Sequence, residues 1–224
     1  VESSRPPGNG QVYDATCSAL AAAGRDAGAE VNRVGILDPD PKELREVIEG
    51  QVNRSEVVVI AGGVGGAATE PVRRVLSELG EMEVTRSAMH PGSVQGFGQL
   101  GRDGVPVFLL PANPVSALVV FEVMVRPLIR MALGRRHPMR RIVKARTLSP
   151  IVSVPGRKGF LRGQLMRDHE TGEYLVQTLG GASGASSHLL ATLAEANCLV
   201  IVPAETEEVR TGEIVDVAFL AQRG

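Results

Sequence analysis

The chain has 224 residues, with 24 basic and 25 acidic side chains, a formal net charge of −1 and 3% aromatic residues. This length fits one large or two small globular domains. The near-neutral charge and the few aromatic side chains argue against a nucleic-acid-binding protein. No apolar run approaches the roughly 18 residues that a membrane helix needs, and no secretory signal is visible, so we expect a cytoplasmic protein without direct membrane insertion. Cys17 and Cys198 are far apart and lack a histidine at zinc-ligand spacing, which argues against a disulfide scaffold or a zinc site.

The first part of the chain alternates helical and strand patterns. Residues 1–11 have the composition of a loop that enters a domain, so we expect the chain to be the C-terminal portion of something longer. Asp14 stands where an N-cap would, before an alanine-rich helix. Val57–Ile60 is a β-branched run, typical of a strand that is buried on both faces of a parallel sheet. The expected helices are Tyr13–Ala29, Pro41–Asn53, Thr69–Leu79 and Val115–Leu133, and the expected strands are Val31–Leu37, Val57–Ile60 and Val105–Leu110.

After Gly134 the pattern changes to short alternating segments, which are separated by Pro-Gly, Thr-Gly and Gly-Gly turns. This pattern predicts a small β-rich second domain, with a hinge within Arg135–Met139. We therefore place an α/β domain at residues 1–136 and a β domain at residues 137–224. The expected strands of the β domain are Arg141–Leu148, Gly159–Met166, Tyr174–Thr178, Cys198–Val202 and Ile214–Leu220.

A glycine-rich loop, Ala61–Gly66, joins the buried strand to the next helix. Glycines at this position leave backbone N–H groups open to an anion, and the helix dipole favours negative charge. The loop has neither the dinucleotide-binding spacing G-x-G-x-x-G nor the Lys-Ser/Thr pair of a P-loop. It is therefore either a phosphate-binding loop or a tight turn between strand and helix. Glu70 either accepts from a ligand hydroxyl or caps the helix.

Three other segments carry polar groups on turns or loops. Prolines fix the turn Pro111–Ser116, in which Asn113 bonds either the local backbone or a ligand. His90–Ser93 presents an imidazole and a hydroxyl, or is a surface hairpin. In Ser183–His188, serines either cap a following helix or bind an anion. Because no Ser-His-Asp order, carboxylate pair or metal-ligand spacing stands out, residue chemistry alone predicts an anion-binding α/β domain followed by a β domain.

These segments, in this order, resemble the MoeA and gephyrin E-domain family, the molybdopterin molybdenumtransferases of molybdenum cofactor synthesis. The resemblance covers essentially the whole chain and implies family domains III and IV. Domain III is a MoaB/Mog-like three-layer α/β domain with a mostly parallel sheet, and domain IV is a small β-barrel-like domain. The resemblance also implies a homodimer. The matching segments are Gly10–Ala15, Val57–Gly66, His90–Gly92, Phe97–Gly98, Pro111–Ala117, Ala196–Asn197, Pro203 and Gly212–Glu213.

The resemblance implies roles for particular residues. The substrate would be molybdopterin or its adenylylated form, used together with Mg²⁺ and molybdate. Asp14 and Glu70 would be acidic catalytic groups that position Mg²⁺ or molybdate, and His90 would replace a family lysine. The substrate-binding residues would be Gly62, Gly63, Gly65, Gly92, Ser93, Asn113, Ser116, Ser186 and Ser187.

The chain departs from the family pattern in its loops. The family loop is Ser-Gly-Gly-Val-Ser-x-Gly followed by an aspartate, whereas here Ala61 and Gly65 replace the serines and Glu70 replaces the aspartate. The family segment Lys-Pro-Gly-Lys-Pro is His90–Val94 here, which removes positive charge. Two anionic reactants need cations beside them because their mutual repulsion is otherwise uncompensated. These losses predict weakened or absent catalysis.

We therefore interpret the chain as a MoeA/gephyrin-type protein that is catalytically weakened or inactive and acts as a gephyrin-like dimeric scaffold. The expected partner is the peptide tail of a cytoskeletal or membrane protein. The positions that match part of the gephyrin peptide groove are Ile201 and Pro203. The alternative is an active molybdopterin molybdenumtransferase that inserts molybdate into adenylylated molybdopterin.

Overall fold

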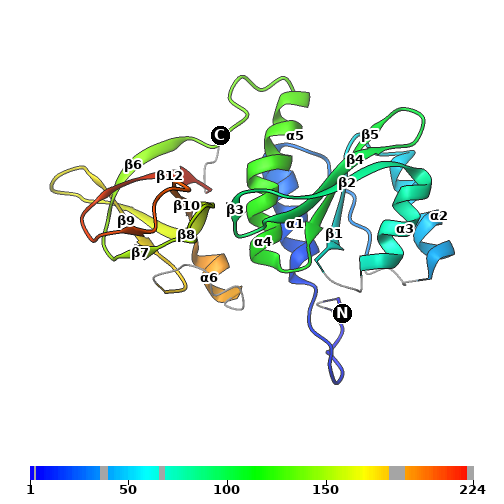
Figure 1. Ribbon diagram of the computed structural model, residues 1–224, viewed down its shortest axis with the longest axis horizontal. Helices are drawn as coiled ribbons and strands as arrows, with labels where there is room; N and C mark the ends of the chain where they lie inside the picture. The colour runs from blue at the N-terminus through cyan, green and yellow to red at the C-terminus, as the bar shows by residue number, and fades with distance from the viewer. Residues whose placement is uncertain (3, 36–39, 66–68, 182–189, 221–224) are drawn as a thin grey trace. The chain divides into compact units, whose positions relative to one another are not determined.

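The computed structural model describes residues 1–2, 4–35, 40–65, 69–181 and 190–220. Within these ranges the chain forms two compact units (Figure 1). The first unit consists of Val1–Ser87 and Val94–Pro138, and the second consists of Ala88–Ser93 and Met139–Gly224. The second unit therefore includes a short segment that lies between two parts of the first unit in the sequence.

The first two helices begin and end at residues typical of caps. The N-cap of α1 (Ala15–Ala27) is Asp14, whose carboxylate accepts a backbone N–H, and the helix ends at Gly28 in the left-handed conformation. Asp40 caps α2 (Pro41–Val52) in the same way. Both predicted helices are confirmed to within two residues at each end. The other elements of this unit are β1 (Val58–Val64), α3 (Glu70–Leu79), β2 (Gly80–Arg86), β4 (Val94–Leu100), β5 (Val105–Pro111), α4 (Pro114–Val120), the π-helical turn η2 (Phe121–Val125) and α5 (Arg126–Ala132).

The sheet of the first unit has the strand order β1-β5-β4-β2. The α/β class is confirmed, but the sheet differs from the mostly parallel arrangement that we expected. β1 and β5 are parallel, whereas β4 is antiparallel to both β5 and β2. The turn 101–104 between β4 and β5 is too short for the crossover that parallel neighbours need. The sequence did not predict β2 and β4, because Gly96, Gly98 and two glutamates give them a weak strand propensity.

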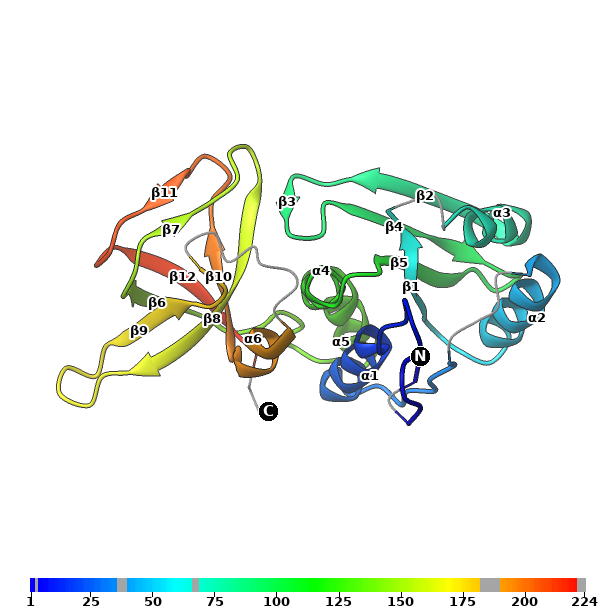
Figure 2. The ribbon, with the colours of Figure 1, turned by 90° about the horizontal axis from the view of Figure 1, so that it is seen from below.

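Helices lie on both sides of this sheet (Figures 1 and 2). On one side, α2 and α3 bury Leu44, Ile48 and Leu76 against Leu100 and Leu109 of the sheet. On the other side lie α1, α4 and α5. The predicted three layers are therefore present, and they leave the ends of β1 and β5 at one edge of the sheet.

The helix formed by α4, η2 and α5 runs without a break from Pro114 to Ala132. Arg126 is buried within it, and its Nη1 atom lies 2.9 Å from Oδ2 of Asp26 in α1. Its Nε atom lies 3.8 Å from a carboxylate oxygen of Glu122, one turn earlier. The ion pair between Arg126 and Asp26 therefore links the long helix to α1. Neither this helix nor any other in the described ranges combines the length and the apolar character that a membrane span requires.

The predicted strand Val31–Leu37 is wrong for its described part, because residues 31–35 form no strand. The segment is held by side chains instead. Val31 packs on α1, where a Cβ atom added to Gly24 would lie 2.9 Å from its side chain. Asn32 donates a hydrogen bond to Gln51 of α2. The segment therefore runs back along α1 towards the beginning of that helix.

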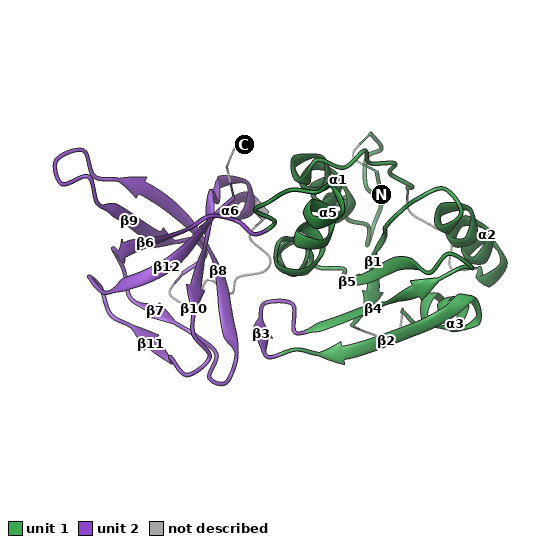
Figure 3. Ribbon diagram, turned by 90° about the horizontal axis from the view of Figure 1, so that it is seen from above, with its two compact units in different colours: residues 1–87, 94–138 green, residues 88–93, 139–224 purple. Residues whose placement is uncertain are grey.

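The second unit is a closed β-barrel (Figure 3). Its strands follow the order β10-β12-β6-β9-β8, and β10 also pairs with β8, so the sheet closes on itself. The predicted barrel-like domain is confirmed. The elements are β3 (Met89–His90), β6 (Ile142–Thr147), β7 (Ile151–Val152), β8 (Lys158–Arg167), β9 (Tyr174–Thr178), α6 (Leu190–Glu195), β10 (Cys198–Val202), β11 (Glu208–Val209) and β12 (Ile214–Phe219).

The barrel interior is filled by branched apolar side chains, including Leu161, Val176, Val200 and Val217. The two-residue strand β3 joins this sheet by pairing in parallel with β8. We placed the domain boundary after residue 136, and the units instead divide after Pro138. The membership of β3 in the second unit depends on a pairing between residues about 70 positions apart, which the sequence pattern does not show.

Candidate functional site at the ends of β1 and β5

The carboxyl ends of β1 and β5 lie side by side because the two strands are parallel neighbours. Their register shifts between Ala61, which pairs with Leu110, and Val64, which pairs with Pro111. Gly62 lies in this bulge with a positive φ of +81°. A Cβ atom added to Gly62 would lie 3.8 Å from the Cβ atom of Ala112. The glycine loop and the proline turn, which the sequence singled out separately, are therefore in contact.

The side chain of Asn113 caps α4. Its Oδ1 atom accepts hydrogen bonds from the backbone N–H groups of Val115 and Ser116, each at 3.1 Å. Of the two roles left open by the sequence, local backbone bonding is therefore the one that this oxygen has. The cap fixes the direction in which the turn leaves β5.

The beginning of α1 lies against the same turn. Thr16 is buried, and its hydroxyl donates a 2.7 Å hydrogen bond to the carbonyl oxygen of Ala112. Asp14, two residues earlier, uses Oδ1 to accept the Cys17 backbone N–H at 3.0 Å. The N-terminus of α1 and the turn before α4 thus form one connected structure, although 96 residues separate Thr16 from Ala112.

The second carboxylate oxygen of Asp14 has a different environment. Oδ2 is buried and accepts no hydrogen bond from the described residues. The Nη2 atom of Arg33 lies 3.6 Å from it, and the same guanidinium donates a hydrogen bond to Glu2. This bond, together with the charges of Glu2 and Asp14, raises the pKa of Arg33. Arg33 was missed by sequence reasoning because it lies inside a segment that we expected to be a strand.

Cys17 is adjacent to these charges but is not a reactive thiol. Burial, a hydrogen bond to Asp14 and the negative charge of Asp14 raise the pKa of the thiol to about 11. A thiol of that pKa is almost entirely protonated at neutral pH, and the protonated form is a poor nucleophile.

The glycine loop continues beyond β1. Gly65 has a φ of +90°, and a Cβ atom added there would meet no atom of the described residues within 4 Å. Glu70 is the first residue of α3 and is exposed. In the described part of the chain, no group of three or more His, Cys, Asp or Glu side chains is arranged to hold a metal ion. A magnesium site at Asp14 and Glu70 stays a prediction.

His90, Gly92 and Ser93 lie in the second unit. His90 pairs with Gly159 of β8, and its buried Nε2 atom has no hydrogen-bond partner among the described residues. Burial and the positive charge of Arg157 lower the pKa of the imidazole below its usual value. The side chain is therefore neutral near pH 7 and carries no lysine-like charge.

Comparisons with known proteins identify the family. The model of the probable molybdopterin binding domain matches residues 3–131. The model of the MoeA C-terminal region, domain IV, matches residues 144–220. The chain belongs to the MoeA family of molybdenum cofactor biosynthesis. It represents domains III and IV, as the sequence resemblance implied.

Individual relatives agree with this assignment. Molybdopterin molybdenumtransferase 1 of Mycobacterium tuberculosis is 81% identical over 224 residues, which is all of this chain and 53% of the relative. The molybdopterin molybdenumtransferase of Haemophilus influenzae is 28% identical over 221 residues, or 52% of its length. The solved structure of the molybdopterin biosynthesis MoeA protein from Pyrococcus horikosii is 33% identical, with a TM-score of 0.78 over 98% of this chain and 51% of that one. The chain spans about half the length of the curated relatives that it matches.

Within the MoeA domain IV, the remaining predicted residues are Ser186, Ser187, Ile201 and Pro203. Ser186 and Ser187 lie outside the described residues. Ile201 is half-buried in β10, and Pro203 is exposed just after this strand. A cavity of about 400 Å³ in this unit is lined by Ser149, Pro150, Gln177, Thr178, Leu179, Gly180 and Gly181, and neither Ile201 nor Pro203 contributes to it.

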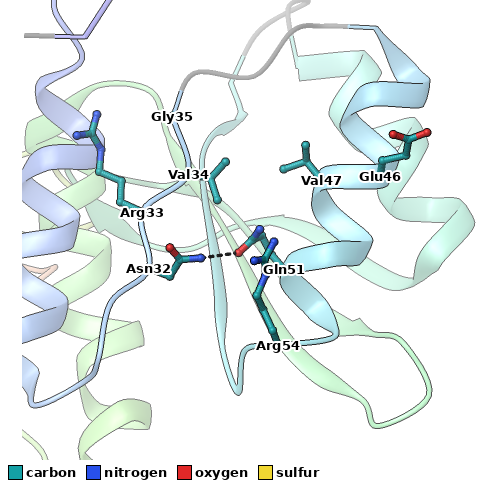
Figure 4. A pocket seen from close by; sticks show the side chains of 8 residues that line it. All are labelled: Asn32, Arg33, Val34, Gly35, Glu46, Val47, Gln51 and Arg54. Carbon is teal, nitrogen blue, oxygen red and sulfur yellow. Dashed lines mark hydrogen bonds between the residues drawn. The ribbon is translucent and has the colours of Figure 1, made fainter. Parts of the chain in front are cut away.

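The MoeA domain III has an open cavity of about 580 Å³ between the segment that includes Arg33 and helix α2 (Figure 4). Arg33 contributes to its wall, but its side chain points away from Val34 and Val47, towards α1. We assign this cavity no ligand. Its lining residues are Asn32, Arg33, Val34, Gly35, Glu46, Val47, Gln51 and Arg54.

Proposed function

We propose that this chain is the molybdopterin-binding and domain IV part of a molybdopterin molybdenumtransferase, which transfers molybdenum to molybdopterin. The observation that carries the proposal is the 81% identity, over the whole chain, to a protein that bears this name. This proposal corresponds to the alternative that the sequence left open. The comparisons give no support to the catalytically weakened scaffold with a peptide groove.

The site at the ends of β1 and β5 suits an anionic substrate. Gly62 and Gly65 have positive φ angles and no side chains, so a phosphate group can approach the backbone closely. The N-terminus of α1 is hydrogen-bonded to the adjoining turn at Ala112 and adds the favourable end of a helix dipole. The loop therefore binds anions through the backbone, which lessens the importance of the missing serine hydroxyls at Ala61 and Gly65.

Acidic residues have a separate role in this proposal. Asp14 holds the beginning of α1 with one carboxylate oxygen, and its other oxygen, which is buried, accepts no hydrogen bond from the described residues. Glu70 is exposed at the beginning of α3. Both would position Mg²⁺ or molybdate for an adenylylated substrate, as the family resemblance implies. The neutral His90 would take no part as a cation.

Titration calorimetry with molybdopterin tests the proposal. It is applied to this chain and, where the gene encodes more of the protein, to the complete product. The informative variant is Gly62→Ala, which adds a methyl group beside Ala112. Its matched control is Gly134→Ala, located after α5. Gly134 also has a positive φ, but a Cβ atom added there would meet no atom of the described residues within 4 Å. Both variants bear similar backbone strain, but a larger loss of affinity is expected for Gly62→Ala.

A second variant tests whether the loop substitutions matter. It combines Ser93→Lys, Gly65→Ser and Glu70→Asp, which restores the family residues. Tight binding by the native protein, with little change in this variant, would support the transferase. No binding by the native protein together with a gain in the restored variant would overturn the proposal, because the native pocket would then be unable to hold the substrate.

A further inference from the structure

We propose that Arg33 binds a tetrahedral oxyanion of the substrate beside the N-terminus of α1, either the phosphate of molybdopterin or molybdate. This inference rests on the proposed function, and it adds a binding residue that the loop motifs do not contain. Both reactants of the transferase are anions, so the site needs positive charge to hold them. The neutral His90 and the hydroxyl of Ser93 do not supply that charge.

The course of the chain brings Arg33 beside the N-terminus of α1. The segment after α1 turns back along that helix, so that Val31 packs at Gly24 and Arg33 lies beside Asp14. Asp14 caps the same helix turn that holds Thr16, and Thr16 donates to Ala112, which touches Gly62 in the glycine loop. A continuous series of contacts within the first unit thus connects Arg33 to the substrate-binding loop.

The guanidinium is not committed to Asp14. Its Nη2 atom is 3.6 Å from Oδ2 of Asp14, which is longer than a hydrogen bond, and Oδ2 accepts none from the described residues. The Arg33 side chain is 30% exposed, so a ligand can reach it. A guanidinium has five N–H donors in a planar fork, and this geometry matches the oxygens of a phosphate. Hydrogen bonding to Glu2 raises the pKa of Arg33, and a guanidinium is charged at neutral pH in any case.

Glu2 shows how an anion is held there. Its carboxylate accepts a hydrogen bond from Arg33 and is itself 33% exposed. A carboxylate and a phosphate make the same kind of charge-assisted bond with arginine. Glu2 therefore occupies a position that a substrate oxyanion would take, and it would compete with the substrate for Arg33.

Calorimetric titrations with molybdopterin and with molybdate alone test this inference in four variants. Arg33→Gln is expected to weaken binding about tenfold or more, and Arg33→Lys less, because lysine keeps the charge without the fork. Glu2→Gln removes the competitor and is expected to tighten binding several-fold. The matched control is Arg45→Gln. Arg45 also bridges two carboxylates, those of Glu49 and Glu78, but it lies on α2.

The outcomes separate the two proposals. Equal affinities for Arg33→Gln and Arg45→Gln, or a loss of affinity in Glu2→Gln, would overturn the role of Arg33 while the transferase stands. If the native protein binds neither ligand, the proposed function fails and the inference fails with it. If Arg33→Gln weakens the binding of molybdate, molybdate is the anion that Arg33 holds. If Arg33→Gln weakens the binding of molybdopterin but not of molybdate, the anion is the phosphate of molybdopterin. Should Arg33→Gln fail to fold, the opposite effects expected for Arg33→Lys and Glu2→Gln still decide the question.

Discussion

β1 and β5 are parallel neighbours in one sheet, but their carboxyl ends are built differently. β5 ends in a turn that is held from two sides, because Asn113 caps α4 and Thr16 of α1 donates to Ala112. β1 ends in a bulge at Gly62, and the chain continues to Gly65, where an added Cβ atom would meet no atom of the ranges that the structure describes within 4 Å. One end is fixed by side-chain hydrogen bonds, and the other has glycine at positions 62, 63 and 65.

The difference shows how a binding site can combine order with access. A turn fixed in advance loses little conformational freedom when a ligand arrives, which favours affinity. A glycine loop lets the ligand contact the backbone directly, which side chains would prevent. We expect substitutions at the β5 end to act mainly on stability and substitutions at the β1 loop to act mainly on binding. Four predictions test this division.

The largest effect on stability is expected for Gly63→Ala. This position is an exception to the division. Gly63 lies in the bulge at the end of β1, but it is buried against the core. Its added Cβ atom would lie 2.9 Å from the buried side chain of Leu109, so the core must shift, at a cost of about 1–3 kcal/mol. Thermal unfolding of the variant and of the unsubstituted protein measures the change. An unchanged melting temperature would show that the core below the bulge is looser than the structure indicates.

Asn113→Ala is expected to cost about 1 kcal/mol of folding stability, because α4 loses an N-cap that accepts two backbone hydrogen bonds. Denaturant unfolding measures this cost. Asn113→Asp keeps an acceptor oxygen and should retain most of the stability. If alanine and aspartate behave alike, the cap does not fix the β5 end.

Thr16→Val should cost roughly 1 kcal/mol or less, since it removes one hydrogen bond with little change of shape. Thr147→Val is the matched control. Thr147 is also buried, and its hydroxyl donates to the Ser149 carbonyl at 2.6 Å in the second unit. Both variants should lose similar stability, but Thr16→Val alone should weaken molybdopterin binding. Loss of binding in both would mean that stability, not the β5 turn, controls affinity.

The smallest perturbation is chemical labelling of Cys17, which reports on the fixed end without a substitution. With a pKa of about 11, about 0.1% of this thiol is ionised at pH 8. Its alkylation rate should therefore rise about tenfold per pH unit between pH 7 and 10. Because the folded pKa is raised, ionisation opposes folding, so stability should fall as the pH rises above 9. Rapid labelling at pH 7 would show that the beginning of α1 opens readily.

Local signals predicted much of this structure, and distant pairings accounted for what was missed. The cap at Asp14, the glycine loop and the proline turn were all visible, because each is encoded within a few residues. The contact of Thr16 with Ala112 was not, because 96 residues lie between them. Arg33 was hidden for a similar reason. Its role depends on a chain reversal after α1 that the apolar residues around it obscured.

The place of β3 in the chain determines how the protein can be divided by proteolysis or by truncation. Residues 88–93 leave the first unit after β2, pair with β8 of the second unit and return to β4. The polypeptide therefore passes between the units three times. After a protease cut near Arg135, the two units would still be joined covalently at the two ends of residues 88–93. A fragment that begins at Met139 would lack one strand of its own sheet. During synthesis, β3 emerges from the ribosome well before its partner β8, so the second unit cannot complete its sheet until β8 has been made.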